Sequence, residues 1–228
     1  MPARTREPLT FYRTPLPGVD ISELQGKLIV ISAPSGAGKT SLVKALLERE
    51  PLLRLSVSHT TRKRRPTEEE GREYHFTSVA EFEQLIAAQD FLEHAKVFGN
   101  LYGTSRAFVE RQLREGHDVV LEIDWQGAGQ VRRAMPRCIS VFILPPSRSA
   151  LASRLARRAT DSEEVIARRL AEAAADMSHY HEFDYVVIND DFAQAVAELQ
   201  RIVEGRGEDL RADRPQLRPL LRELLGAP

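Results

Sequence analysis

The sequence contains little cysteine, little net charge and no long apolar segment. Its 228 residues include a single cysteine, Cys138, which excludes an internal disulfide framework and indicates a reducing compartment. The formal net charge of −1 argues against a general nucleic-acid-binding protein. No apolar run approaches the roughly 18 residues needed to span a bilayer, and the N-terminal segment lacks the apolar centre of a secretory signal. We therefore expect a soluble cytoplasmic protein that partners neither nucleic acid nor membrane.

One stretch, LIVISAPSGAGKTS at residues 28–41, carries the clearest signal. Its first four residues are apolar and mostly β-branched, which is typical of a strand buried on both faces of a parallel sheet. A turn of small residues follows, and after Lys39 the apolar residues have helical spacing. Backbone N–H groups in such a turn and at a helix N-terminus bind phosphate. Lys39 can reach the β- and γ-phosphates, and Thr40 can offer its hydroxyl to Mg²⁺. We therefore predict an ATP-binding loop made of Ala33, Pro34, Ser35, Gly36, Ala37, Gly38, Lys39, Thr40 and Ser41.

This loop departs from the pattern G-x-x-x-x-G-K-[ST] at one position, because Ala33 stands where the pattern has glycine. Alanine adds one methyl group and is tolerated unless the backbone there has a positive φ. The plain alternative is a glycine-rich turn that binds no ligand. The Lys39–Thr40 pair directly after the turn favours the phosphate-binding interpretation.

A basic run at residues 62–65 is followed by an acidic run at residues 68–70. Neighbouring runs of this kind are typical of a solvated, self-screening loop. In a chain that already binds one phosphate, the basic run can instead form the second anion site that a phosphoryl acceptor requires. The sequence alone leaves both interpretations open.

Two further segments carry charge beside expected core elements. The apolar strand at 119–123 ends in Asp124, which either holds a water bound to Mg²⁺ or merely caps the strand end. Residues 149–178 have a helical pattern rich in arginine, with a break near Asp161 and Ser162 where a second helix can be capped. These arginines form either a lid over phosphates or ordinary solvent-facing charge.

The remaining pattern predicts the other elements of an α/β domain. Helices are expected at 79–88 with Ser78 as N-cap, at 107–114 and at 192–203, and strands at 56–61, 74–76, 139–144 and 185–189. Residues 91–95 are expected as strand or turn, and residues 98–104 are glycine-punctuated and aromatic, with turn chemistry on both sides. Leucines between 217 and 225 have helical spacing, so this segment is expected to dock on the domain or on a second subunit.

In this order, the segments resemble those of a bacterial-type guanylate kinase from about Lys27 to about Val203. The motifs that carry the resemblance are APSGAGKTS, SVSHTTRKRRPTEEEGREYHF, FLEHAKVFGNLYGTS, EIDWQGA, FILPPS, RLARRATDSEEVIARRL and VINDDF. Each is weak alone, but their order and spacing are specific. The resemblance implies the reaction ATP + GMP = ADP + GDP by direct in-line phosphoryl transfer with Mg²⁺, in purine nucleotide metabolism and GMP recycling.

The resemblance also implies an α/β fold with a P-loop NTPase-type parallel sheet flanked by helices, an inserted GMP-binding region and a helical lid. The guanylate-kinase-like domain is expected at 26–205. The residues themselves predict a flexible lead at 1–25 and a tail with helical spacing at 206–228. Within the domain, the implied parts are the core at 26–57, 105–146 and 176–205, the GMP-binding region at 58–104 and the lid at 147–175.

Site residues follow from the resemblance by motif position. Guanine is expected to be read by Ser58, Glu93 and Thr104, with Glu122 on the same GMP side, and the GMP phosphate to be held by Arg62, Arg65, Tyr74 and Tyr102. The implied catalytic groups are Lys39, Arg62, Arg154, Arg158, Arg169 and Asp124. The implied metal contacts are Thr40 and Asp124, and Asn189 is expected near the adenine end of ATP.

Two positions depart from the family pattern. Glu122 stands where the family usually has the first aspartate of an Asp-x-Asp pair, which lengthens the side chain by a methylene. Ala159 stands where the family often has glycine, which is expected to stiffen the lid turn.

Two other functions fit parts of the pattern. A guanylate-kinase-like interaction domain that has lost catalysis typically has a damaged phosphate loop or damaged lid arginines, whereas Lys39, Thr40 and Arg158 are all present. A related phosphotransferase with another acceptor is disfavoured by the guanine-reading residues. The expected partners are the substrates ATP and GMP, and the sequence leaves a monomer and a homo-oligomer equally open.

Overall fold

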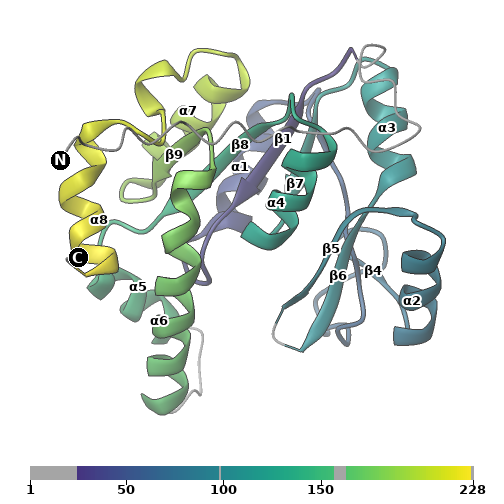
Figure 1. Ribbon diagram of the computed structural model, residues 1–228, viewed down its shortest axis with the longest axis horizontal. Helices are drawn as coiled ribbons and strands as arrows, with labels where there is room; N and C mark the ends of the chain where they lie inside the picture. Colours follow the sequence, from purple (N-terminus) through teal and green to yellow (C-terminus); the bar gives the residue numbers. More distant parts are fainter. Residues whose placement is uncertain (1–24, 98, 157–162, 227–228) are drawn as a thin grey trace, which may run out of the picture.

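The computed structural model describes residues 25–97, 99–156 and 163–226, apart from the side chains of residues 163–167. Most of the expected lead, together with Arg158 and Ala159 of the expected lid, lies outside these residues. Figure 1 shows a core sheet with helices on both faces, and a second sheet with its own helix beside the core. The α5–α6 pair and the second sheet lie on opposite sides of the core sheet (Figure 1).

The core sheet has five parallel strands in the order β2-β7-β1-β8-β9. Its strands are β1 (Leu28–Ser32), β2 (Arg54–Leu55), β7 (Val119–Glu122), β8 (Ile139–Leu144) and β9 (Tyr185–Ile188). The α-helices are α1 (Lys39–Arg49), α2 (Val79–Ala87), α3 (Arg106–Arg114), α4 (Trp125–Ala134), α5 (Arg148–Ala156), α6 (Glu163–Met177), α7 (Phe192–Val203) and α8 (Arg218–Leu225). Short 3₁₀ turns are η2 (Ser178–Glu182), η3 (Glu208–Leu210) and η4 (Pro215–Leu217).

Successive residues of the core strands pack into two separate apolar layers. Ile29 and Ile31 belong to the layer built with α1 and α7, whereas Leu28 and Val30 belong to the layer built with α3, α4, α5, α6 and α8. Because neighbouring side chains of a strand point to opposite faces, a sheet covered on both sides needs apolar residues at every position. The buried strands predicted from the apolar runs at β1 and β8 are confirmed.

Between β2 and α3 the chain leaves the core and forms a second sheet in the order β4-β3-β6-β5. Its strands are β3 (His59–Thr60), β4 (His75–Phe76), β5 (Phe91–Val97) and β6 (Asn100–Ser105). The strand predicted at 56–61 is shorter than expected, because only residues 59–60 form it, as β3, which pairs with β6 in the second sheet. The preceding strand β2 pairs with β7 in the core.

The glycine-punctuated stretch at 98–104 contains a strand that the turn signals did not predict, since residues 100–105 form β6. Gly103 in this strand permits a close approach rather than a turn. A Cβ at Gly103 would lie 3.0 Å from both Phe82 and Phe91. The glycine therefore lets two aromatic rings of the second sheet's core pack directly on the strand backbone.

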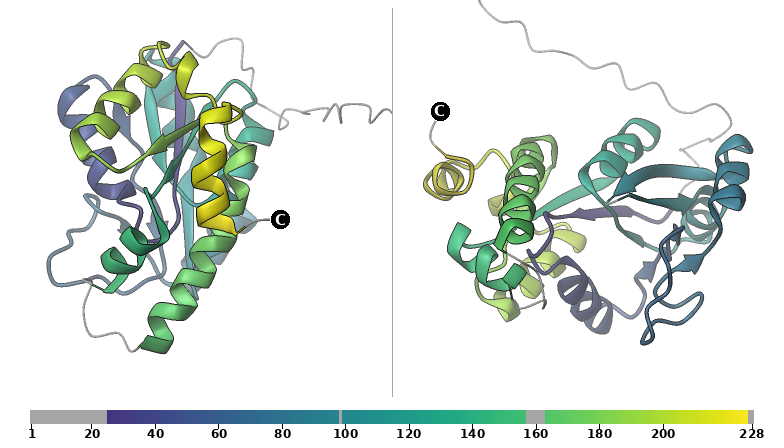
Figure 2. Two further views of the ribbon diagram at one scale, coloured as in Figure 1. Left: turned by 90° about the vertical axis from the view of Figure 1, so that its left-hand side faces the viewer. Right: turned by 90° about the horizontal axis from the view of Figure 1, so that it is seen from below.

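Two helices show how local sequence and packing position the outer elements. The N-terminus of α2 carries the predicted cap: Ser78 Oγ accepts from the Glu81 backbone N–H, and the Glu81 carboxylate accepts from the Ser78 backbone N–H. The C-terminal segment docks on this domain, with Leu217 of η4 and Leu224 of α8 buried in the layer that includes α5 and α6. Figures 1 and 2 show α8 lying beside α6.

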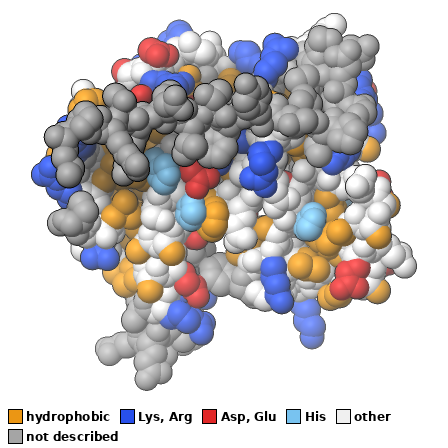
Figure 3. All heavy atoms as spheres, in the orientation of Figure 1, with side chains coloured by type: hydrophobic (Ala, Val, Ile, Leu, Met, Phe, Trp, Pro, Cys, Tyr) orange, Lys and Arg blue, Asp and Glu red, His pale blue; other side chains and the backbone are white. Residues whose placement is uncertain are grey.

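The surface carries both signs of charge. On the face shown in Figure 3, basic and acidic side chains are interspersed, in keeping with the near-zero net charge of the sequence. Within the described ranges, no helix combines the length and the apolar character needed to cross a membrane.

Candidate active site

The loop between β1 and α1 is held in place from β9. Asn189, which directly follows β9, donates from Nδ2 to the Ala37 carbonyl at 2.7 Å. It packs so closely that a Cβ at Gly38 would lie 2.4 Å from Asn189 Nδ2. The structure thus places Asn189, the residue expected near the adenine end of ATP, against the backbone of the loop.

Backbone angles explain the residue choice in this loop. Gly36 and Gly38 have φ values of 87° and 94°, which glycine adopts without strain. Apart from glycines, Gln89 is the one described residue with a positive φ. Ala33 therefore occupies its position without backbone strain, and its departure from the pattern leaves the shape of the loop intact.

Two of the expected cations bind backbone carbonyls at the carboxyl ends of core strands. Lys39 Nζ donates to the Ile123 carbonyl at 2.9 Å. Arg154 of α5 donates from Nη2 to the Asn189 carbonyl at 2.8 Å. Its other terminal nitrogen, Nη1, is buried and has no hydrogen-bond partner among the described atoms. Arg169 is half-buried on α6, and Arg158 lies outside the described residues.

The end of β7 supplies two carboxylates that face different neighbours. Thr40 Oγ1 donates a hydrogen bond to Glu122 Oε1. Asp124 is the N-cap of α4, where its Oδ1 accepts from the Gly127 backbone N–H at 2.8 Å. Asp124 also lies near Glu93, because a Cβ at Gly127 would be 2.4 Å from Glu93 Oε2 and 3.2 Å from Asp124 Oδ1.

This arrangement differs in part from the expected placement of the two acids. Glu122, expected on the GMP side, contacts the loop threonine. Burial raises the pKa of Tyr74, and the charge of Glu122 also helps to raise it. Asp124, expected beside Thr40, lies near Glu93. The reason is local: β7 ends at Glu122, so Asp124 already belongs to the start of α4. The alternative expectation was that Asp124 caps the strand end, whereas the structure shows it capping the helix that follows.

Glu93 is a buried carboxyl group between the second sheet and α4. It is 3% exposed, and its Oε1 accepts from Thr104 Oγ1 at 2.5 Å across the β5–β6 pair. Burial raises the pKa of Glu93 to about 7, the Thr104 hydrogen bond opposes this rise, and the nearby charge of Asp124 adds to it. Above this pKa the acid is a carboxylate, which can accept hydrogen bonds from a ligand that presents paired N–H donors.

Arg62 lies in a cluster of polar and aromatic groups. Its guanidinium donates to Glu68 Oε1 at 2.7 Å and to the Lys63 carbonyl at 2.9 Å. The carbon atom of the guanidinium lies 5.2 Å from the centroid of the Tyr74 ring. The Tyr74 and Tyr102 rings meet edge-on with centroids 5.8 Å apart. The hydrogen bond to Glu68 is the main cause of the raised pKa of Arg62.

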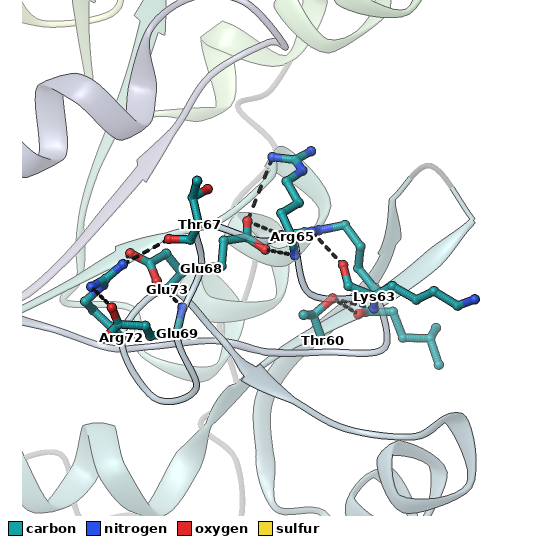
Figure 4. Close-up of polar contacts among 10 residues, drawn as sticks. Thr60, Lys63, Arg65, Thr67, Glu68, Glu69, Arg72 and Glu73 are labelled. Carbon is teal, nitrogen blue, oxygen red and sulfur yellow. Dashed lines mark hydrogen bonds and ion pairs between the residues drawn. The ribbon is translucent and has the colours of Figure 1, made fainter.

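Arg65 and Ser58, the other expected GMP contacts, are placed less closely. Arg65 is exposed, and its Nη1 lies 3.8 Å from Glu68 Oε1, while its backbone N–H donates to Glu68 Oε2 at 2.8 Å (Figure 4). Ser58 is half-buried where the chain crosses between the two sheets, and its carbonyl accepts from the His75 backbone N–H at 2.9 Å. The structure thus gathers Arg62, Tyr74 and Tyr102 and connects Arg65 to them through Glu68.

Three residues of the site escaped sequence reasoning. Glu68 holds both arginines, Gly127 makes room for Glu93, and Gln130 fixes α4 to β5. Gln130 donates from Nε2 to the His94 carbonyl at 2.7 Å and accepts from the His94 N–H at 3.2 Å. The acidic run after the basic run was the visible signal for Glu68, whereas the other two depend on a tertiary contact.

Comparisons with known proteins cover the loop, the core sheet and the second sheet together. A sequence model of the family "Guanylate kinase" matches residues 25–206. A guanylate kinase of Alkalilimnicola ehrlichii is 57% identical over 203 residues, which are 89% of this chain and 100% of that protein. A guanylate kinase of Methylococcus capsulatus is 57% identical over 89% of this chain and 99% of its own length.

A solved structure agrees with these matches. The crystal structure of guanylate kinase from Anaplasma phagocytophilum superposes with a TM-score of 0.68 at 33% identity, covering 87% of this chain and 95% of that one. By its sequence over nearly the whole domain and by its fold, the chain belongs to the guanylate kinase family.

Proposed function

We propose a residue-level assignment in which the core sheet holds ATP and the second sheet holds GMP. The chain is an enzyme that phosphorylates GMP to GDP with ATP, as its family membership shows. In this reaction an oxygen of the GMP phosphate attacks the γ-phosphorus of ATP while the bond to the departing ADP oxygen breaks. The protein's task is to position both nucleotides and to stabilise the charge of the transferring group.

On the donor side, residues 33–41 cradle the ATP phosphates through backbone N–H groups. Lys39, Arg154, Arg158 and Arg169 supply positive charge to the transferring phosphoryl group. The buried Nη1 of Arg154, which has no partner in the described part of the chain, fits an anion at this place. Residues 147–175 act as the lid that brings the last three cations to the phosphates.

The donor side also fits Mg²⁺. The hydroxyl of Thr40 and the carboxylate of Glu122 form a pair of hard oxygen donors beside the loop, and Mg²⁺ in kinases binds few such groups together with substrate phosphates. When bound, the ion would neutralise charge on the β- and γ-phosphates. Asp124, which lies near Glu93, is therefore assigned to the GMP pocket and not to the metal.

On the acceptor side, residues 58–104 bind GMP. Glu93 accepts from the N1–H and N2 amine of guanine, with Ser58, Thr104 and Asp124 completing that pocket. Arg62, Arg65, Tyr74 and Tyr102 hold the GMP phosphate, since guanidinium forks and phenol donors suit a dianion. The single observation that carries the assignment of the two acids is that Glu122 accepts a hydrogen bond from Thr40, whereas Asp124 lies near Glu93.

The test couples ADP release to a spectrophotometric readout with GMP, AMP, UMP and CMP as acceptors. We expect turnover with GMP and little with the other three. Glu122→Gln should raise the Mg²⁺ concentration that gives half-maximal rate, whereas Asp124→Asn should chiefly raise the KM for GMP. An unchanged Mg²⁺ requirement in Glu122→Gln would return the metal contact to Asp124.

We also propose the cytoplasm as the compartment, because the single cysteine excludes an internal disulfide.

A further inference from the structure

The base of α6 is joined to the first residue of α4 by a specific contact. Trp125 Nε1 donates to Asp176 Oδ1 at 3.1 Å, across 51 positions of the sequence. Trp125 directly follows Asp124, the N-cap that lies beside Glu93. Asp176 is the second-last residue of α6. The contact therefore connects the helix that begins at the acceptor site to the helix that carries Arg169.

Further contacts close this junction around the tryptophan ring. The His179 imidazole stacks on the Trp125 indole with ring centroids 3.4 Å apart and planes 8° apart. His179 Nδ1 lies 2.6 Å from Glu182 Oε1, and the other oxygen of Glu182 accepts from Arg132 at 2.6 Å. Because Arg132 belongs to α4, the chain of contacts returns to the helix on which it began.

The junction lies on the side of α6 that includes the expected lid cation. Arg169 and Asp176 are seven residues apart, so they project from nearly the same side of the helix. Ala173, between them, is fully buried. The direction in which Arg169 projects is thus set by how the base of α6 is held.

We propose that Trp125 and Asp176 are positioning residues, whose hydrogen bond fixes the base of α6 against α4 and so aims Arg169 at the phosphoryl group. The inference rests on the proposed function, in which Arg169 acts on that group. It adds two residues that contact neither nucleotide in the assignment above.

The environment of Asp176 supports a charged acceptor at working pH. Burial raises the pKa of Asp176 to about 6, while the hydrogen bond from Trp125 lowers it. The charges that face it are Asp124 on α4, His179 on η2 and Glu172 on α6 itself. Above this pKa the indole N–H donates to a carboxylate, which makes the stronger bond.

The experiment measures kcat, the KM values for ATP and GMP, and thermal midpoints in Trp125→Phe, Asp176→Leu and Asp176→Asn. The first two remove the bond, and kcat should fall about tenfold with both KM values within about twofold, because slight misplacement of a catalytic group lowers kcat. Asp176→Asn keeps an oxygen acceptor and should recover most of the rate. If Trp125→Phe fails to fold, Asp176→Leu against Asp176→Asn still decides the question.

A double-mutant cycle separates positioning from stability. If Trp125 acts through Arg169, Trp125→Phe should have little further effect on kcat in an Arg169→Met background. The matched control is Gln200→Ala, which removes a hydrogen bond from α7 to the C-cap of α1, Gln200 Nε2 to Glu50 Oε1 at 2.7 Å. It should lower the thermal midpoint and leave kcat unchanged.

The outcomes separate the two proposals. Full additivity in the cycle, or normal kcat in Asp176→Leu, overturns the positioning role while wild-type turnover with GMP stands. Absence of GMP turnover in the wild type overturns the proposed function itself. Equal loss of kcat in Asp176→Asn and Asp176→Leu would show that the charge, rather than the hydrogen bond, is required, and would also overturn the inference as stated.

Discussion

The donor and acceptor halves of the candidate site satisfy their polar groups in different ways. In the donor half, Lys39, Arg154 and Asn189 bind backbone carbonyls, which stay in place whether or not a nucleotide is present, and the bond from Thr40 to Glu122 is the exception. In the acceptor half, side chains bind one another: Arg62 binds Glu68, and Thr104 binds Glu93. A substrate must therefore exchange existing side-chain partners in the acceptor half, whereas the donor half is already organised around the loop.

This difference affects which half of the site depends on pH. A buried acid held by a hydroxyl has a shifted pKa, as Glu93 does. We expect donor-half substitutions to act mainly on kcat, and acceptor-half substitutions to act on GMP recognition and on its pH dependence.

The largest effect is expected at the donor half. Lys39→Ala should lower kcat by roughly 10²–10³-fold, because a positioned cation stabilises charge that develops in the transition state. GMP affinity should stay within about twofold, since the acceptor half is untouched. Steady-state rates with calorimetric GMP titration check both parts. A variant with near-normal kcat would contradict the phosphoryl-transfer role of Lys39.

The next effect should appear at the buried acid of the acceptor half. Glu93→Gln should lower kcat/KM for GMP by at least about tenfold and narrow the preference for GMP over AMP, because one neutral acceptor and a mispaired amide replace two charge-assisted bonds. The KM for ATP should not change. Glu83→Gln, at an exposed glutamate of α2, is the matched control. A preserved GMP-to-AMP ratio would show that another group reads guanine.

The two halves should also differ in how their kinetic constants depend on pH. The raised pKa of about 7 means that Glu93 takes up a proton as pH falls through 7, and the protonated form loses an acceptor for guanine. We expect kcat/KM for GMP to fall about tenfold from pH 8 to pH 6, with the KM for ATP nearly constant. Glu93→Gln should flatten the part of this profile that does not come from the GMP phosphate itself. An equal slope in both proteins would assign the titration elsewhere.

The smallest effect is expected at Glu68. Its contact with Arg62 is partly exposed, so Glu68→Gln should raise the KM for GMP only about threefold, or ~0.6 kcal/mol, through looser placement of the guanidinium. Glu69→Gln, at the neighbouring and more exposed acid, is the control. A lower KM in Glu68→Gln would mean that this carboxylate competes with the GMP phosphate instead of orienting Arg62.

The core sheet and the loop could be predicted from the sequence because their signals are local. Strands buried on both faces appear in the sequence as apolar runs. The start of a helix can be predicted from its capping residue, as for α2 at Ser78. The helix α7 was expected at 192–203 and occurs at those residues. In each case the pattern along a few turns or strand residues determines the element without knowledge of distant partners.

The second sheet and the two acids at the end of β7 depend on distant partners. Gly103 resembles a turn residue until Phe82 and Phe91 are known to pack on it. Glu122 and Asp124 are two positions apart, so a continuing strand would point both to one side. The strand ends between them, and a backbone N–H of α4 then draws Asp124 toward the acceptor half.

The junction at the base of α6 also contains an intrinsic fluorophore. Trp125 is the single tryptophan of the whole sequence, so red-edge excitation reports on one indole at one place. That indole stacks on His179 and donates to Asp176, and its emission depends on both neighbours. Any movement of α6 against α4 during turnover will therefore appear as a change in intrinsic fluorescence, without an attached dye.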